Sequence, residues 1–241
     1  MCYRTATPDL DMLQGYFQRE ALYAREIFTI EDFEHFFCAD GFLMPRLPIS
    51  TTENPRLIEP AMWKLIPHWV RTEADAKNYA NTLNAASEEI FEKASYKPYI
   101  GKYRALLWID GFFEPHHPDA KTTIPYFIHH KDAEPLTLGC VYSNWLNHET
   151  GEVIKTFSII TTPANELLSK VHNEKKRMPL VIPPDKRDEW LSNLGKSQIQ
   201  SLMTPLPDGI LEAYPVSRTL YRKGFNPNVP EAVIKAGDAL I

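Results

Sequence analysis

The second residue of the chain is a cysteine, and its position gives it chemistry that an internal cysteine lacks. Once Met1 is removed, Cys2 carries a thiol and a free α-amine on neighbouring carbons. Such an amine has a reference pKa of about 7.7 to 8.0, so part of it is neutral and nucleophilic at physiological pH. This 1,2-aminothiol can attack an aldehyde and close a five-membered thiazolidine. It also suits an N-terminal nucleophile that hydrolyses amides with its own amine as base.

The other cysteines and the histidine pairs do not extend this chemistry to a metal. Cys38 and Cys140 stand among apolar residues without any CxxC spacing, which is typical of buried structural thiols. The pairs His116-His117 and His129-His130 would point to opposite faces of a strand, and no cysteine or carboxylate set completes a ligand group. We therefore expect no metal and no other cofactor.

Composition narrows the class of protein. The chain has 241 residues, 44% of them hydrophobic and 24% charged, which is typical of a globular protein and excludes extended disorder. Its formal net charge is -5, whereas a protein that coats DNA nonspecifically is usually basic, so any nucleic acid must bind in a local groove. No run of about 20 apolar residues predicts a membrane span, and no signal peptide is recognisable, so we expect a cytoplasmic protein.

Helices are predicted where N-cap, proline and apolar-stripe signals coincide. These predicted helices follow Thr7-Pro8, run from Thr72 toward Asn81, span 85–93, follow Thr162-Pro163 up to His172, and span 185–194 before Gly195.

The centre of the chain is rich in β-branched and aromatic residues, which predicts strands. The predicted strands span 104–113, 123–130, 136–145 and 153–162, with a hairpin loop at 147–152. Because strands and helices do not alternate regularly, the pattern favours an α+β fold with antiparallel or mixed sheets over a doubly wound sheet. Without a repeat or a flexible linker, residues 1–241 are expected to form a single domain.

Six motifs occur in an order that is similar to one known family. They read CYR at 2–4, WKLIPHW at 63–69, LNAASE at 83–88, DGFFE at 110–114, TTPAN at 161–165, and a histidine at 172 followed by RMP at 177–179. The C-terminal segments YPVS at 214–217 and NPNVP at 226–230 are also similar to the last segment of that family. Together they resemble the SOS-response-associated peptidase (SRAP) family, whose members shield abasic sites in single-stranded DNA.

The resemblance implies a fold, a partner and a reaction. The fold would be a β-rich barrel with flanking helices, and Cys2 would lie exposed at the floor of a basic groove for single-stranded DNA. Cys2 would crosslink covalently to the ring-opened sugar of an abasic site, after the protein has removed its own Met1. We expect a monomer that works in the cytoplasm and joins the nucleoid when DNA is damaged.

The catalytic set that the resemblance implies is Cys2, Asn84, Glu114 and His172. Each of the last three has an ordinary alternative: Asn84 as a helix N-cap, Glu114 as a solvated strand end, and His172 as a surface residue that compensates a helix dipole. In a polar cleft, Glu114 could instead shuttle protons with a raised pKa, while His172 passes a proton to the sugar oxygen.

Arg4, Arg177 and Trp69 are the candidate DNA contacts. A guanidinium suits phosphate oxygens, and an exposed indole can stack on a base. Trp63 is expected in the core, and the run 174–177 is expected to be a solvated turn from which only Arg177 reaches the groove. The chain departs from the family pattern at Lys64, Val70 and Ala86, which puts DNA affinity in doubt more than chemistry.

Two other functions remain open from the residues alone. One is a cysteine peptidase that acts on other proteins, which would turn over unrelated peptides, whereas self-processing happens once in each chain. The other is a single-stranded DNA-binding module that has lost the reaction.

The identity of the mature N-terminus is the first thing to measure. We expect the purified protein to lack Met1, because only then does Cys2 have a free amine. The mass of the intact protein should therefore be lower than that of the full sequence by one methionine residue. A retained Met1, or a blocked amine on Cys2, would contradict the prediction.

Overall fold

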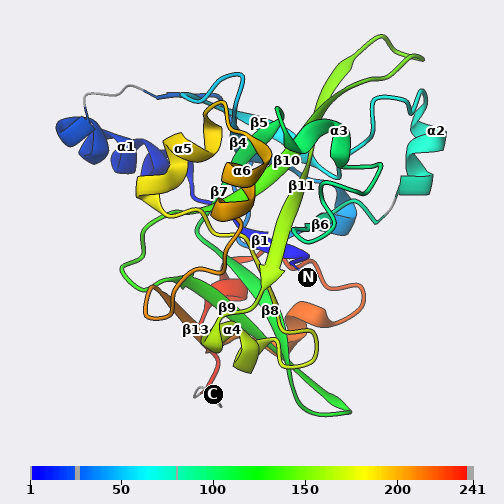
Figure 1. Ribbon diagram of the computed structural model, residues 1–241. Coiled ribbons are helices and arrows are strands. Elements are labelled where there is room, and N and C mark those ends of the chain that lie inside the picture. The colour runs from blue at the N-terminus through cyan, green and yellow to red at the C-terminus, as the bar shows by residue number, and fades with distance from the viewer. Residues whose placement is uncertain (1, 25–27, 80, 238–241) are drawn as a thin grey trace.

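The computed structural model describes residues 2–24, 28–79 and 81–237. Its strands are β1 (Arg4–Ala6), β2 (Thr29–Ile30), β3 (Ala39–Asp40), β4 (Arg46–Thr51), β5 (Leu57–Trp63), β6 (Asn84–Ala86), β7 (Arg104–Ile109), β8 (Gly111–Asp119), β9 (Thr122–His130), β10 (Leu136–Leu146), β11 (Val153–Pro163), β12 (Arg177–Pro179) and β13 (Leu211–Pro215). One sheet has the order β13-β9-β8-β1-β3, and the other has the order β12-β11-β10-β7-β4-β5-β2 (Figure 1).

The larger sheet closes into a barrel. Strand β11 pairs antiparallel with β10 and parallel with β5, so β11, β10, β7, β4 and β5 form a ring. Closure satisfies backbone groups that an open sheet would leave exposed at its edges. The predicted α+β fold with a β-rich barrel and flanking helices is confirmed.

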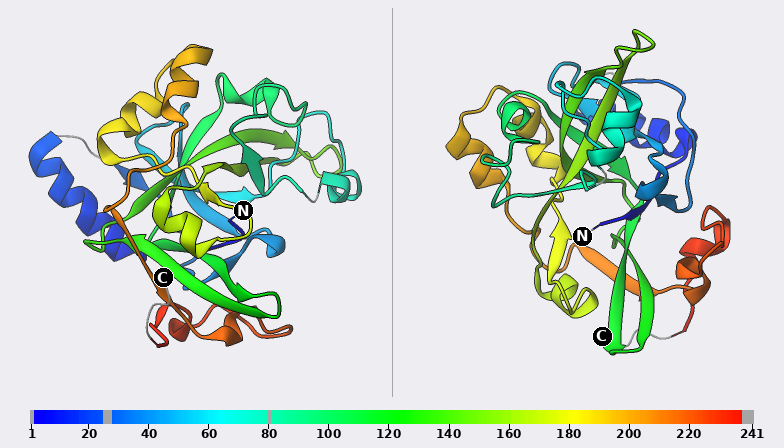
Figure 2. Two further views of the ribbon diagram at one scale, coloured as in Figure 1. Left: turned by 60° about the horizontal axis from the view of Figure 1, so that its bottom comes forward. Right: turned by 90° about the vertical axis from the view of Figure 1, so that its right-hand side faces the viewer.

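The helices lie outside the barrel and the second sheet. They are α1 (Leu10–Ala24), α2 (Glu73–Ala76), α3 (Lys97–Ile100), α4 (Glu166–Val171), α5 (Arg187–Leu191) and α6 (Lys196–Leu202). The N-terminal strand β1 lies between β8 and β3 in the second sheet, and Figure 2 shows it in dark blue near the middle of the molecule. None of the helices in the described parts of the chain has both the length and the apolar character needed to cross a membrane.

The predicted strand 104–113 is in fact two strands that belong to different sheets. β7 ends at Ile109 in the barrel, and β8 begins at Gly111 in the second sheet. At Gly111 an added Cβ would lie 2.4 Å from the Phe127 ring and 2.5 Å from the carbonyl oxygen of Ile128. Only glycine allows this close approach, and the turn carries the chain to Glu114.

The hairpin prediction is confirmed. β10 and β11 pair antiparallel and are joined by a loop in which Gly151 has a φ of 75°. A positive φ is easily adopted by glycine, which explains its place in this loop. The strand predicted at 123–130 is also found, as β9.

The helix predicted at 85–93 is wrong. Residues Asn84–Ala86 instead form β6, which pairs parallel with β11, with Asn84 opposite Ile159, and turns follow. The backbone bonds offered by the edge of β11 outweigh the local helix propensity of two alanines, which is only a weak preference. Asn84 is therefore not a helix cap.

Two predicted helix starts are displaced toward the C-terminus. At α1 the cap is Asp9, whose Oδ1 accepts from Met12 N at 2.7 Å, whereas the Thr7 hydroxyl accepts from Phe36 N. At α4 the cap is Asn165, because Pro163 still belongs to β11. Proline is tolerated at the edge or end of a strand as well as in the first turn of a helix. A Thr-Pro pair alone therefore does not show where the helix begins.

Two further helices are shorter than predicted. Thr72 does cap α2, since its Oγ1 accepts from Asp75 N at 3.1 Å, but α2 ends at Ala76 and continues only as a 3-10 turn. The helix predicted at 185–194 is α5 preceded by another 3-10 turn. Gly195 does not end α5 but stands at the start of α6.

The predicted core residues are buried. Cys38 is 1% exposed and Cys140 is fully buried, which confirms them as structural thiols. Trp63 is also fully buried, and its indole N–H donates to the carbonyl of Leu83 at 3.0 Å.

The turn at Gly111 gives a test of the junction between the sheets. Gly111→Ala should lower the free energy of unfolding by about 1 to 3 kcal/mol, the usual cost of overpacking, because both the Phe127 ring and a backbone oxygen must shift. The matched control is Gly101→Ala, where φ is -68° and a Cβ meets no atom within 4 Å. Urea denaturation should show the control unchanged or slightly stabilised, and equal stability of the two variants would contradict the prediction.

Candidate active site

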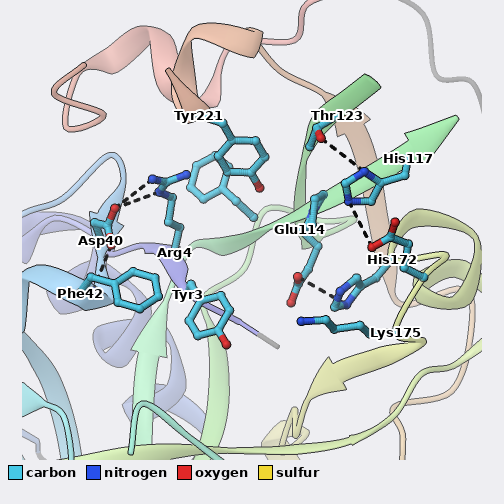
Figure 3. Close-up of a pocket in the computed structure, with 13 residues that line it drawn as sticks. Tyr3, Arg4, Asp40, Phe42, Glu114, His117, Thr123, His172, Lys175 and Tyr221 are labelled. Atoms are coloured by element: carbon cyan, nitrogen blue, oxygen red, sulfur yellow. Dashed lines mark hydrogen bonds and ion pairs between the residues drawn. The ribbon is translucent and has the colours of Figure 1, made fainter. Parts of the chain in front are cut away.

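A pocket of about 380 Å³ opens where β1 and β8 meet the segment after α4 (Figure 3). Aromatic side chains of Tyr3, Phe42 and Tyr221 form part of its lining. Its charged and titratable lining residues are Arg4, Asp40, Glu114, His117, His172, Glu174 and Lys175. Four segments far apart in sequence thus bring ionisable groups to one cavity.

Glu114 is the buried carboxylate of this pocket. It lies on β8, opposite Tyr126 of β9, and only 1% of it is exposed. Burial disfavours the ionised form and raises the pKa of Glu114 to about 7. Near neutral pH the carboxyl group can therefore both donate and accept a proton, and the alternative of a solvated strand end is wrong.

His172 lies directly after α4 and faces Glu114. Its Nδ1 is 3.5 Å from Oε2 of Glu114 and 3.1 Å from the carbonyl oxygen of Arg177. A neighbouring carboxylate alone would favour the charged imidazole, but burial prevails and lowers the pKa of His172 to about 4. The ring is therefore neutral at pH 7, and the carbonyl partner assigns the proton to Nδ1. With 3% exposure, His172 is not a surface residue.

Cys2 is fully buried, which contradicts the expected exposed position. It packs into the main hydrophobic core behind Tyr3 and Arg4, and its Sγ lies 3.7 Å from the carbonyl oxygen of Arg4. Burial, and then the negative charge of Glu114, raises the pKa of the Cys2 thiol well above its usual value. In a chain that still carries Met1, the sulfur is thus a protonated thiol away from solvent.

Asn84 connects β6 to the N-terminal segment. Its Nδ2 donates to the carbonyl oxygen of Cys2 at 2.8 Å, across 82 positions of sequence. Its Oδ1 is buried and accepts no hydrogen bond from the described residues. A buried acceptor without a donor lowers the stability of the fold by about 1 to 3 kcal/mol. The Oδ1 of Asn84 is such an acceptor, and it is available to a ligand that binds beside Cys2.

The two arginines expected to bind DNA already have acidic partners. Arg4 lines the pocket, where its guanidinium bonds Asp40 at 2.9 Å and lies over the Tyr221 ring. Arg177 forms an ion pair with Glu88 and donates to the carbonyl of Thr161 at 2.7 Å. Arg177 does not line the pocket.

Trp69 is placed away from the pocket but remains accessible. It is 41% exposed, and its indole N–H donates to the hydroxyl of Tyr79 at 3.0 Å. Its role as a stacking platform stays a prediction, and a strand would have to extend beyond the pocket to reach it.

The pocket has mixed charge, which corrects the expectation of a basic floor. Its two Lys and Arg residues, Arg4 and Lys175, face three carboxylic acids, Asp40, Glu114 and Glu174. Sequence reasoning missed Lys175, because it assigned the run 174–177 to solvent except for Arg177. The structure reverses that choice, and no local sequence signal shows which side chain of a short polar loop turns inward.

The sequence matches one family, and the fold agrees with it. The model of the SOS response associated peptidase (SRAP) family covers residues 1–222, and the chain belongs to that family. Among curated relatives, abasic site processing protein YoaM of Bacillus subtilis is 34% identical over 157 residues, which are 64% of this chain and 66% of YoaM. Abasic site processing protein HMCES of Pongo abelii is 27% identical over 177 residues, covering 62% of this chain and 49% of that protein. The chain thus spans just under two thirds of the length of YoaM and about half of the length of HMCES.

Solved structures agree on the fold. A crystal structure of a protein from Bacteroides thetaiotaomicron is 32% identical, with a TM-score of 0.82 over 98% of this chain and 100% of that chain. A protein from Bordetella bronchiseptica, 19% identical, has a TM-score of 0.75 over 90% of this chain and 100% of its own. The second likeness concerns the fold alone.

The raised pKa of Glu114 gives a testable dependence of stability on pH. The folded chain binds the Glu114 proton more tightly than the unfolded chain, in which the pKa of this carboxyl group is near 4.5. Glu114 should therefore make folding less favourable as the pH rises from about 4.5 to 7. Glu114→Gln removes this effect. The difference in unfolding free energy between variant and wild type should grow in the variant's favour across this interval, by on the order of 3 kcal/mol, and then level off.

Thermal and urea unfolding at a series of pH values measure this difference. Glu92→Gln, which replaces an exposed carboxylate, serves as the control and should show no such growth. A Glu114→Gln difference that does not change with pH would contradict the burial argument.

Proposed function

We propose that this protein captures abasic sites in single-stranded DNA covalently, through the amine and thiol of Cys2 after Met1 has been removed. The observation that carries the proposal is the convergence of Asn84, Glu114 and His172, from three distant segments, around the second residue of the chain. The relatives named abasic site processing proteins support the choice of substrate. Such a protein would act on damaged DNA at the nucleoid, as a monomer in the cytoplasm.

Removal of Met1 is the first step. Hydrolysis of the bond between Met1 and Cys2 consumes one water and releases methionine. Before it, the nitrogen of Cys2 is an amide and cannot attack a carbonyl group. After it, the α-amine is nucleophilic near neutral pH. The peptidase activity is in this account a single event on the chain itself.

Capture of the aldehyde then needs two bond-forming steps. The α-amine adds to the aldehyde carbon of the ring-opened deoxyribose, and loss of one water gives an imine. The sulfur of Cys2 next attacks the imine carbon, and the thiol proton ends on the nitrogen. The product is a thiazolidine, so aldehyde and aminothiol are converted into the crosslink and one water without any oxidant or reductant.

Glu114 is the group suited to the proton transfers. In its protonated form it can give a proton to the departing hydroxyl of the carbinolamine, and in its ionised form it can take the thiol proton. The second role matters because burial keeps the thiol of Cys2 from ionising unaided. A group with a pKa of about 7 is present in both forms at the working pH.

Asn84 and His172 are suited to holding and relaying. The Nδ2 of Asn84 fixes the carbonyl of Cys2, and its unused Oδ1 can accept from the new α-amine or from a sugar hydroxyl. The neutral ring of His172 adjoins Glu114 and holds its proton on Nδ1, so its Nε2 can first accept a proton and then pass it to the sugar oxygen. Each residue thus acts on a different atom of the reaction.

Crosslinking to an abasic strand tests the proposal. The mature protein should form a heat-stable complex with a uracil-containing single strand that has been treated with uracil glycosylase, and Cys2→Ala should form none. Glu114→Gln should slow the reaction about 10²-fold or more, the usual contribution of a positioned acid or base. The rate of the wild type should also change near pH 7, and that change should disappear in the variant.

Three results would count against this account. A stable band with Cys2→Ala would exclude the thiazolidine, and turnover of unrelated peptides would favour a general peptidase. An unaltered rate with Glu114→Gln would exclude Glu114 from the proton transfers, and a wild type that binds the strand without forming the crosslink would leave only DNA binding to explain.

A further inference from the structure

The segment between His172 and β12 is fixed against the pocket at both ends. The side chain of Asn173 accepts from the backbone N–H of His117 at 3.1 Å and donates to its carbonyl at 2.7 Å. At the other end, Lys176 N donates to the carbonyl of His172 at 2.9 Å, and Ala164 N donates to the carbonyl of Lys176 at 3.0 Å. These hydrogen bonds fix the backbone of the short loop 173–176 in one conformation against β8.

This path sends neighbouring basic side chains in different directions. Lys176 has a φ of 49°, a left-handed conformation that reverses the chain between Lys175 and Arg177. Lys175 consequently lines the pocket, whereas Arg177 pairs with Glu88 outside it. Figure 3 shows the Lys175 side chain extending toward Glu114 and His172.

Lys175 also differs from Arg4, the other basic residue that lines the pocket, because among the described residues only Arg4 has an acidic partner. Arg4 is neutralised by Asp40 at 2.9 Å and covered by Tyr221. Lys175 is exposed and, within the part of the chain that the structure describes, forms no ion pair. Its charge nevertheless reaches Glu114 and His172, where it favours the ionised carboxylate and the neutral imidazole. Of the two Lys and Arg residues that line the pocket in the described part of the chain, Lys175 is thus the one without an acidic partner.

We propose that Nζ of Lys175 binds the backbone phosphate next to the sugar that reacts at Cys2, and so fixes how the strand enters the pocket. The inference rests on the proposed function, since it takes the ligand to be single-stranded DNA. Lysine binds phosphate as a compact point charge on a flexible stem, which suits a mobile strand. One such contact beside the reacting sugar offsets the repulsion between the phosphates and the carboxylic acids of the pocket.

Binding without chemistry is the first measurement. Wild-type protein, Lys175→Met and Lys175→Arg are titrated with a fluorescent single strand that carries a tetrahydrofuran residue, an abasic analogue without an aldehyde. Lys175→Met should bind about tenfold more weakly at low salt, and the slope of log Kd against log salt should fall by about 0.7, as expected for one lost phosphate contact. Lys175→Arg should keep most of the affinity. The matched control is Lys176→Met, in the same loop but outside the pocket lining, which should behave as the wild type.

The crosslinking rate separates positioning from chemistry. With the abasic strand, Lys175→Met should be slowed about tenfold at low DNA concentration and less than threefold at saturation. With free 2-deoxyribose, an aldehyde that has no phosphate, the two proteins should reach the same maximal rate, measured on the plateau of each pH profile. The change in rate near pH 7 should move to higher pH in Lys175→Met, because the lysine charge opposes the effect of burial on the pKa of Glu114.

The outcomes distinguish this inference from the proposed function. If the wild type binds the tetrahydrofuran strand and fails to crosslink, the covalent step is wrong while the phosphate contact is still decided by the salt slopes. Unchanged affinity and salt slope in Lys175→Met would overturn the contact. Equal slowing with DNA and with 2-deoxyribose would also overturn it, as would a wild type that binds no single strand.

Discussion

The site depends on a carboxyl group that the fold removes from water. Glu114 is 1% exposed, and its burial shifts the pKa to about 7, where an ordinary glutamate would be fully ionised. A buried carboxylate is costly, so its position must be imposed by the strands on either side of β8. The glycine turn that leads into β8 is what separates this strand from the barrel and turns Glu114 toward the N-terminal segment.

The strands could be predicted from sequence because their signal is local, whereas much of the site could not. The 147–152 loop and the β-branched runs around it define a hairpin without any tertiary information. The segment 84–86 becomes a strand only because β11 offers an edge, and that edge is more than 70 positions away. The inward position of Lys175 depends likewise on Asn173 bonding His117, a contact that no pattern of residue types reveals. The catalytic candidates Asn84, Glu114 and His172 were reached through ordered motifs, and the structure brings them near Cys2.

The charge of the molecule constrains how such a site can bind an anionic polymer. With a net charge of -5 and a pocket in which carboxylic acids outnumber Lys and Arg residues, long-range attraction contributes little. Arg4 and Arg177 form ion pairs with Asp40 and Glu88, and their contact with DNA stays a prediction. Under the proposed function, recognition would rest on a few local contacts, and the exposed indole of Trp69 stays a predicted stacking platform.

The buried thiol imposes an order on the steps of the proposed reaction. In a chain that begins at Met1, Cys2 has neither a free amine nor an ionisable sulfur in contact with solvent, so an aldehyde meets no nucleophile at residue 2. Cleavage of the Met1–Cys2 bond creates the amine first, and amine attack needs no thiolate. The thiol is required only once the imine carbon is already tethered to the same residue, where Glu114 can accept its proton. Burial of the sulfur is therefore compatible with capture, provided that the amine acts before the thiol.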